Sequence, residues 1–247
     1  MAIKSSKNSK NERLISAGSN KTPFAIVESY KTLRTNIVSI LAKKNANILA
    51  VSSPNASEGK STTALNIAIT LSQLNKKVVI LDTDSRKPTI HKKVKINNDR
   101  GCMDILLGDA KIDDVTVAYS PYLDIIVSGA RVKNPSELLS SFEFEKLLGE
   151  LSDRYDYVII DTPPINVVSD SLIIIQKAEA FIMIVRAGST KYEAFEYACD
   201  SLKNLDIDLD GVVINGSSQK LGYYSRGKYS YYRSRYGYGY GYGNNKN

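Results

Sequence analysis

The sequence predicts an α/β fold, a doubly wound and mostly parallel sheet with helices on both faces. Between residues 46 and 216, short runs rich in Val and Ile alternate with longer segments of helical periodicity. Each run is apolar on both sides of the strand alternation, as expected for parallel strands covered on both faces. This alternating order is typical of the class. The runs are NILAVSS, KVVILD, YLDIIVSG, YDYVIID, AFIMIVRAG and DLDGVVING.

Helical segments separate these runs. STTALNIAITLSQLNK follows the first run directly, and PSELLSSFEFEKLLGELSD precedes the fourth. Asn134 and Pro135 introduce the second of these segments as an N-cap and a proline at the first helical position. YEAFEYACDSLKNL is a third amphipathic pattern and precedes the last run. The elements therefore predict one domain over residues 22–216.

Charge separates the two ends of the chain from this domain. Residues 1–21 hold five Lys or Arg and one acid, and residues 220–247 hold six Lys or Arg and no acid. The net charge of +7 therefore leaves about −3 on residues 22–219. Neither end shows strand or helix periodicity. We expect a flexible basic N-terminal arm over residues 1–21 and a disordered Tyr-rich tail over residues 217–247.

Cysteine usage and hydropathy bear on the compartment. Cys102 and Cys199 lack CxxC spacing and neighbouring His, which predicts free thiols in a reducing compartment. The N-terminal residues contain no apolar signal region, and no stretch reaches the roughly 20 apolar residues of a membrane span. We therefore expect a cytoplasmic chain without a membrane segment of its own.

A phosphate-binding loop is predicted where the first strand run meets the first helix. The sequence VSSPNASEGKSTT ends in Gly59, Lys60 and Ser61, in the position of the GxxxxGK(S/T) motif. Pro54 replaces its first Gly. Backbone N–H groups at the helix N-terminus would hold phosphates, Lys60 would reach the β- and γ-phosphates, and Ser61 would bind Mg²⁺. The predicted nucleotide-binding residues are Ser57, Glu58, Gly59, Lys60, Ser61 and Thr62.

Three aspartates end two other strand runs. In VVILDTDSRKP, Asp82 and Asp84 follow the apolar run, and their spacing places both side chains on one face of the strand. In YVIIDTPP, Asp161 follows the apolar run in the same way. Ligands of α/β sheets bind at this carboxyl edge, where a carboxylate can hold Mg²⁺ directly or through water. Lys60, Ser61 and these acids together predict a Mg²⁺–nucleotide site. Arg86 either orients the carboxylates or touches phosphate.

The tail gathers tyrosines where no core can use them. YYSRGKYSYYRSRYGYGYGYG contains nine tyrosines among Gly, Ser, Arg and Lys, without Leu, Ile or Val. Gly and Ser would keep such phenols exposed and reachable. They are Tyr223, Tyr224, Tyr229, Tyr231, Tyr232, Tyr236, Tyr238, Tyr240 and Tyr242.

These motifs resemble the bacterial protein-tyrosine kinases of capsule and exopolysaccharide synthesis (BY-kinases), which are related to P-loop ATPases. The resemblance covers roughly residues 22–247 and rests on SSPNASEGKST (Walker A), VILDTDSRKP (Walker A′), YVIIDTPP (Walker B) and the Tyr-rich tail. It implies a P-loop NTPase-type sheet and an ATP- and Mg²⁺-dependent kinase that autophosphorylates the nine tail tyrosines. Lys60, Asp82, Asp84 and Asp161 would be catalytic, with Asp84 accepting the tyrosine proton; Ser61, Asp82 and Asp161 would face the metal.

Two positions depart from the family pattern. Ser57 follows Ala56 where the family has Pro-Gly, and a Gly there permits positive φ. The oligomerisation motif ExxRxxR reads Glu28, Lys31 and Arg34, and Lys31 lacks the fork of an Arg. A local Glu28–Lys31 pair on a solvated helix is the alternative to an oligomer contact there.

The resemblance also implies partners. They are other subunits in a ring-like homo-oligomer that phosphorylates in trans, a separate membrane activator that recruits the chain to the inner membrane face, and protein substrates such as sugar-nucleotide enzymes. No nucleic acid is expected.

Two other functions remain open from the sequence. A partitioning or positioning ATPase would hydrolyse ATP to switch a dimer, although Asn55 occupies the place of that class's signature Lys. A nucleic-acid-binding protein could stack tail aromatics on bases. That function leaves the three aspartates unexplained.

Overall fold

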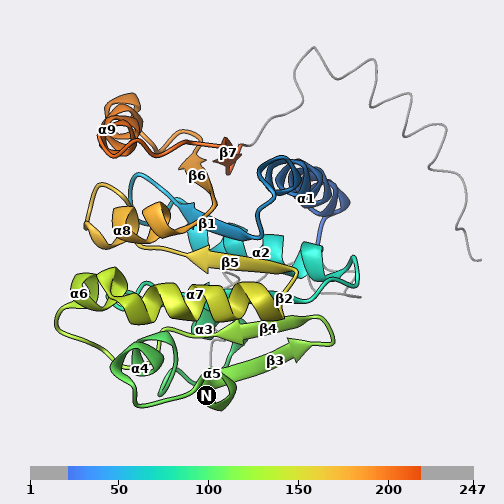
Figure 1. Cartoon of the computed structure of the whole chain (residues 1–247). Helices are drawn as coiled ribbons and strands as arrows, with labels where there is room; N and C mark the ends of the chain where they lie inside the picture. The colour runs from blue at the N-terminus through green and yellow to red at the C-terminus, as the bar shows by residue number, and fades with distance from the viewer. Residues whose placement is uncertain (1–21, 218–247) are drawn as a thin grey trace, which may run out of the picture. The chain divides into compact units, whose positions relative to one another are not determined.

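The computed structural model describes residues 22–217 and shows a seven-stranded sheet in the order β3-β4-β2-β5-β1-β6-β7 (Figure 1). All neighbouring strands are parallel except β3 and β4. The predicted doubly wound α/β class is thereby confirmed. The nine tail tyrosines and residues 1–21 lie outside the described residues. The strands are β1 (Ile48–Ser52), β2 (Val78–Asp82), β3 (Thr116–Ser120), β4 (Leu123–Ile126), β5 (Tyr157–Asp161), β6 (Ala180–Arg186) and β7 (Gly211–Asn215).

Helices cover both faces of the sheet. In Figure 1, α7 lies in front of the sheet and α2 behind it. Alternate residues of one strand serve the two layers: Val78 and Ile80 pack with α2, whereas Val79 and Leu81 pack with α7. The helices between residues 22 and 217 are α1 (Phe24–Lys44), α2 (Lys60–Ser72), α3 (Ile90–Val94), α4 (Cys102–Leu107), α5 (Ile112–Val115), α6 (Pro135–Ser140), α7 (Phe142–Arg154), α8 (Asp170–Lys177) and α9 (Tyr192–Lys203).

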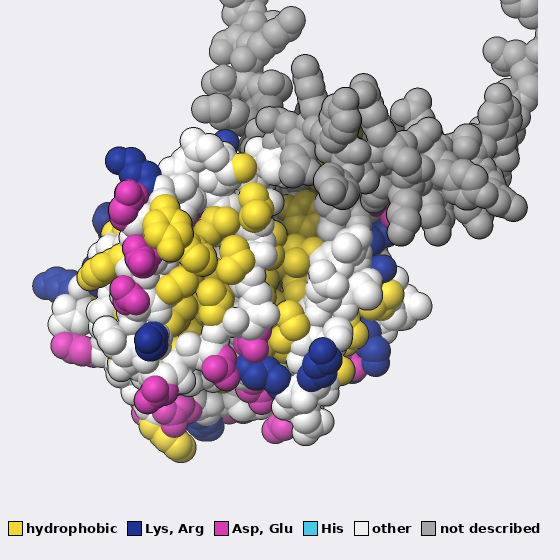
Figure 2. All heavy atoms as spheres, turned by 90° about the horizontal axis from the view of Figure 1, so that it is seen from above, with side chains coloured by type: hydrophobic (Ala, Val, Ile, Leu, Met, Phe, Trp, Pro, Cys, Tyr) yellow, Lys and Arg dark blue, Asp and Glu magenta, His cyan; other side chains and the backbone are white. Residues whose placement is uncertain are grey.

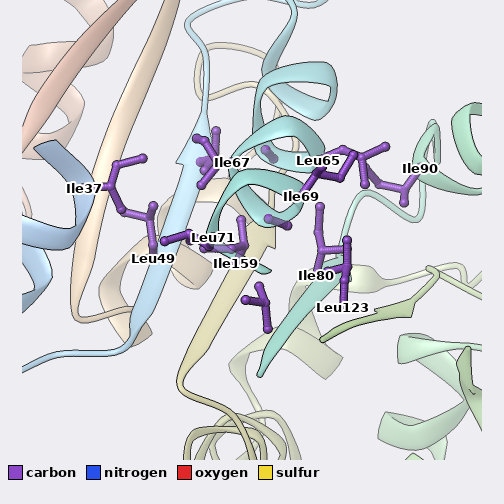
Figure 3. Close-up of a cluster of buried hydrophobic side chains, with 14 of the residues drawn as sticks. Ile37, Leu49, Leu65, Ile67, Ile69, Leu71, Ile80, Ile90, Leu123 and Ile159 are labelled. Atoms are coloured by element: carbon purple, nitrogen blue, oxygen red, sulfur yellow. The ribbon is translucent and has the colours of Figure 1, made fainter. Parts of the chain in front are cut away.

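Helix α2 is the central helix of one layer. All its residues from Thr63 to Ser72 are buried, although two Thr, one Ser and one Asn are among them. Its leucines and isoleucines pack against side chains of β1, β2 and β5. Figure 3 shows this cluster, with Leu71 of α2 beside Ile159 of β5. Because close packing on all sides leaves α2 little freedom, its N-terminus is held rigidly at the end of β1.

Two local predictions differ from the structure. Residues 116–120 form β3, an antiparallel edge strand that the sequence reasoning missed, because its central residues are exposed and carry no buried apolar pattern. The helix predicted over residues 135–153 is two helices, since Ser141 adopts an extended conformation between α6 and α7. Pro135 does begin α6, but the side chain of Asn134 donates to Glu137 instead of capping the helix.

The β7 edge of the sheet carries exposed apolar side chains. Figure 2 looks onto α9, β7 and α1, and hydrophobic side chains gather in the middle of this face, with charged groups around them. Val212 and Ile214 of β7 are 44% and 64% exposed. Within residues 22–217, no helix is long and apolar enough to cross a membrane.

A candidate nucleotide and phosphoryl-transfer site at the carboxyl edge of the sheet

The loop between β1 and α2 has the backbone expected of a phosphate-binding loop. Gly59 caps α2 with φ +100°, and a Cβ atom there would lie 2.0 Å from Asn215 Nδ2. Only glycine fits that position without a shift of its neighbour. Ser57 also has positive φ, at 67°. A non-glycine residue therefore holds the conformation that a Gly at this position of the family pattern would adopt freely.

Side chains from distant strands brace this loop. Arg186 Nη1 donates to the Ser57 carbonyl at 3.1 Å, and Asn215 Nδ2 donates to the Glu58 carbonyl at 2.9 Å. Arg186 and Asn215 are partners in the β6–β7 register, so one end of the sheet supplies both contacts. The buried Glu58 carboxylate accepts from Asn55 N at 3.0 Å and from Thr190 Oγ1 at 2.6 Å. The Glu58 side chain thus braces the loop. Its role in nucleotide binding stays a prediction.

Lys60 lies at the centre of the site. Its Nζ is 3.2 Å from Asp84 Oδ2, 3.5 Å from Asp161 Oδ1 and 3.2 Å from Ser61 Oγ. Burial opposes the charge on Lys60, but Asp161, Asp84 and Asp82 outweigh it and raise the pKa of Lys60. The ammonium group is therefore charged and shared between two carboxylates. The start of α2, the turn after β2 and the end of β5 meet at this atom.

Asp82 is placed by the β2–β5 register directly beside Asp161. Its Oδ1 accepts the Asp84 N–H at 3.1 Å, and its Oδ2 accepts the N–H groups of Thr89 and Ile90 at 3.3 and 3.2 Å. Burial, followed by the neighbouring Asp161, raises the pKa of Asp82 to about 7. In this structure Asp82 shapes the turn after β2 and the start of α3. Its catalytic and metal-binding roles stay predictions.

Asp161 fits a metal-bound nucleotide. Its side chain is fully buried, and within residues 22–217 its Oδ2 has no hydrogen-bond partner. Burial raises the pKa of Asp161, while Lys60 and Ser61 favour its charged form. A buried carboxylate oxygen without a partner is costly unless a ligand or water satisfies it. No three His, Cys, Asp or Glu side chains of residues 22–217 form a metal cage, and Mg²⁺ bound with a nucleotide needs only one or two protein carboxylates.

Within residues 22–217, Arg86 makes no hydrogen bond to any of the three site aspartates. Its guanidinium group binds Asp170 at the start of α8 with two hydrogen bonds, of 2.7 and 3.2 Å. Ser136 of α6 also donates to Asp170. Arg86 therefore ties the turn after β2 to α6 and α8. Burial alone would raise the pKa of Asp170, but Arg86 and Ser136 lower it below its usual value.

Lys93 is a site residue that sequence reasoning missed. It lies on the short helix α3, and its Nζ donates to Thr62 Oγ1 in the first turn of α2 at 2.8 Å. Thr62 was predicted to bind nucleotide, so the structure brings a second lysine to the phosphate-binding segment. No motif could have identified it, since KKV in IHKKVK looks like an ordinary solvated turn.

The predicted oligomerisation residues lie on α1, away from Lys60. Glu28 and Lys31 form an exposed pair with an N–O distance of 2.8 Å. Arg34 Nη1 donates to the Thr70 carbonyl at 2.9 Å, near the opposite end of α2 from Lys60. Each of the three side chains thus has a partner within the chain, and their role in assembly stays a prediction.

Known proteins are similar to this chain in sequence and fold. The AAA domain family matches residues 46–205. The tyrosine-protein kinase YwqD of Bacillus subtilis is 36% identical over 206 residues, which are 83% of this chain and 85% of YwqD. The tyrosine-protein kinase wzc of Salmonella typhimurium is 33% identical over 93% of this chain, but the match covers only 32% of that longer protein.

Structural comparison agrees with these relatives. The kinase domain of the Escherichia coli tyrosine kinase ETK has a TM-score of 0.74 and 27% sequence identity, and the match covers 77% of this chain and 75% of that domain. The relatives favour a kinase over the partitioning ATPase and the nucleic-acid-binding protein. The chain belongs to the bacterial tyrosine-protein kinases.

Proposed function

We propose that this protein-tyrosine kinase transfers the γ-phosphoryl group of Mg²⁺–ATP to tyrosines of its own C-terminal cluster and of other proteins. The observation that carries the proposal is the position of Lys60, within 3.5 Å of both Asp84 and Asp161 at the start of a buried α2. A helix N-terminus, a lysine and carboxylates on adjacent strand ends suit phosphoryl transfer, which depends on positioning and charge stabilisation.

The residues would divide the work as follows. The N–H groups of residues 57–62 and Lys60 bind the phosphates, and Ser61 and Asp161 face the metal. When bound, Mg²⁺ would be held by Ser61 and Asp161 and would neutralise the negative charge that develops during transfer. Lys60 is shared with Asp84 in the structure, so phosphates that attract Lys60 would release the Asp84 carboxylate. Asp84 then accepts the tyrosine hydroxyl proton while the phenolic oxygen attacks the γ-phosphorus and ADP leaves.

Labelling with radioactive ATP and Mg²⁺ tests the activity. We expect label on tyrosine in the wild-type chain and none in a variant with all nine tail tyrosines replaced by Phe, unless a second protein is supplied. Release of inorganic phosphate without labelled tyrosine would contradict the kinase and indicate a switch ATPase. Salt-sensitive binding to single-stranded RNA without labelling would indicate the nucleic-acid-binding protein.

Two carboxylate variants separate the roles of the site. Asp161→Asn is expected to weaken Mg²⁺–nucleotide binding, whereas Asp84→Asn is expected to slow transfer by roughly 10²–10⁴-fold and leave nucleotide affinity nearly unchanged. Nucleotide affinity and single-turnover transfer are measured on the same preparations. If Asp84→Asn lost nucleotide binding as fully as Asp161→Asn, Asp84 would not be the base.

The proposal extends to regulation of capsule or exopolysaccharide synthesis, through a ring-like homo-oligomer and a separate membrane activator that recruits a cytoplasmic chain. The exposed Glu28–Lys31 pair on α1 can exchange its partner for a neighbouring subunit at little cost. Each phosphotyrosine adds about −1.5 to −2 to the basic tail, which would repel acidic neighbours. Light scattering should show a large unphosphorylated species that Glu28→Ala or phosphorylation makes smaller. Equal masses would contradict this assembly.

A further inference from the structure

Lys93 reaches the phosphate-binding segment from outside every recognised motif. Ile90, three residues earlier, is fully buried, and the backbone N–H groups of Thr89 and Ile90 are bound to Asp82. These contacts anchor α3 at its start, so the side chain of Lys93 is directed at α2 by a fixed backbone. Its Nζ lies 2.8 Å from Thr62 Oγ1.

Lys93 has no anionic partner in the described part of the chain. Within residues 22–217 its one recorded hydrogen bond goes to the neutral Thr62 hydroxyl, and no carboxylate lies within ion-pair distance. Lys93 is half-buried. Burial lowers the pKa of Lys93, Asp161 counteracts this in part, and Lys60 adds to it. A cation that loses hydration without a counter-ion is poorly satisfied until an anion arrives.

Of the two lysines that the structure places at this site, Lys93 is the one that can pair with a bound anion without giving up an ion pair. Lys60 forms ion pairs with Asp84 and Asp161, whereas Lys93 forms no ion pair within residues 22–217. The Thr62 hydroxyl that accepts from Lys93 lies one residue after Ser61, in the first turn of α2. The N–H groups of this turn would face a bound phosphate. A phosphate that contacts Thr62 is therefore within reach of the same ammonium group, since 2.8 Å is a full hydrogen-bond contact.

We propose that Lys93 is a second phosphate-binding cation, which contacts the nucleotide's phosphate chain beside Thr62. This inference rests on the proposed function, because it adds a ligand-binding residue to the same site. Lys60 would then neutralise phosphate from the loop and Lys93 from α3. The phosphate chain would be held between two elements, and the position of α3 would affect nucleotide affinity.

The test measures binding of AMP-PNP with Mg²⁺ by calorimetry, with adenosine as the phosphate-free control. Lys93→Gln should weaken AMP-PNP roughly tenfold, as expected for loss of a charge-assisted hydrogen bond, and should leave adenosine unchanged. The salt dependence of AMP-PNP binding should also become shallower. Lys93→Arg should retain most of the affinity. Lys92→Gln removes the same charge from an exposed neighbour on α3 and should stay within about twofold of wild type.

A double-mutant cycle with Thr62→Val separates direct binding from support of Thr62. If Lys93 contacts phosphate, Lys93→Gln should still weaken AMP-PNP in the Thr62→Val background. Loss of the effect in that background, or an affinity of Lys93→Gln equal to wild type, would overturn the inference and leave the kinase assignment standing. A wild-type chain that binds no AMP-PNP would overturn the proposed function and the inference together.

Discussion

Removal of the Lys60 charge should affect stability as well as phosphoryl transfer. In Lys60→Met, the buried Asp84 and Asp161 lose the ammonium group that lies 3.2 and 3.5 Å from them. Asp82 is fully buried beside them and already has its pKa raised to about 7. The variant therefore leaves these buried carboxyl groups without an ion-pair partner, and at least one of them must take up a proton for the fold to persist.

Proton uptake limits how much unfolding free energy Lys60→Met can lose. An Asp carboxyl group has a pKa of about 3.9 in the unfolded chain. Protonating it costs about 1.4 kcal/mol for each pH unit above that value. The loss of unfolding free energy for one such group is thus at most about 4 kcal/mol at pH 7 and about 2 kcal/mol at pH 5.5. The pKa of a buried carboxyl group is raised in the folded state, so its destabilising effect grows as pH rises above the unfolded-state pKa. Lys60→Met should accordingly regain stability as pH falls from about 7 to about 5.5.

Urea unfolding of wild type, Lys60→Met and Lys60→Arg at these two pH values measures the effect. Lys60→Arg keeps the charge and should lose less stability than Lys60→Met at pH 7. Tail phosphorylation should be absent from Lys60→Met. A stability loss that is the same at both pH values would show that lost packing, not uncompensated charge, is responsible. Retained autophosphorylation would refute the assigned site.

Three further changes test other parts of the structure. Asp170→Asn should lower the unfolding free energy by about 1–3 kcal/mol at neutral pH, because Asp170 loses its charged contact with Arg86. Since the pKa of Asp170 is lowered in the folded state, the difference from wild type in urea unfolding should shrink below about pH 4. In the native protein, iodoacetamide with mass spectrometry should modify Cys199 before Cys102, which is fully buried and has its pKa raised by burial; equal rates would contradict this burial. Ser57→Gly should raise the unfolding free energy by about 0.5–1 kcal/mol in urea, because relief of positive-φ strain outweighs the entropy cost of glycine; a loss would mean that Ser57 is not strained.

The fold class and the meeting of three strand ends follow from local patterns. Strands covered on both faces need continuous apolar runs, and the carboxyl ends of parallel strands share one edge. Asp82 and Asp161 were therefore expected at the same edge once their runs were recognised as parallel strands. The β2–β5 pairing in the structure makes them direct partners. The edge strand β3 escaped prediction because an antiparallel strand with exposed central residues has no such run.

Contacts between segments far apart in the chain could not be predicted from local sequence patterns. Arg86 follows Asp84 closely, yet only the packing of α8 against α6 shows that its guanidinium group binds Asp170. The bracing of the P-loop by Arg186 and Asn215 likewise depends on the β6–β7 register.

The sequence by itself determined the α/β class, the phosphate-binding loop and the family, because these depend on periodicity and on residue types at short fixed spacing. Only the tertiary structure decided which partners the charges take. Lys60 pairs with Asp84 and Asp161, Asp82 turns to the backbone of α3, and Lys93 reaches Thr62. Charge–charge and hydrogen-bond energies depend on distance and burial, and the chain sets both quantities only when it packs.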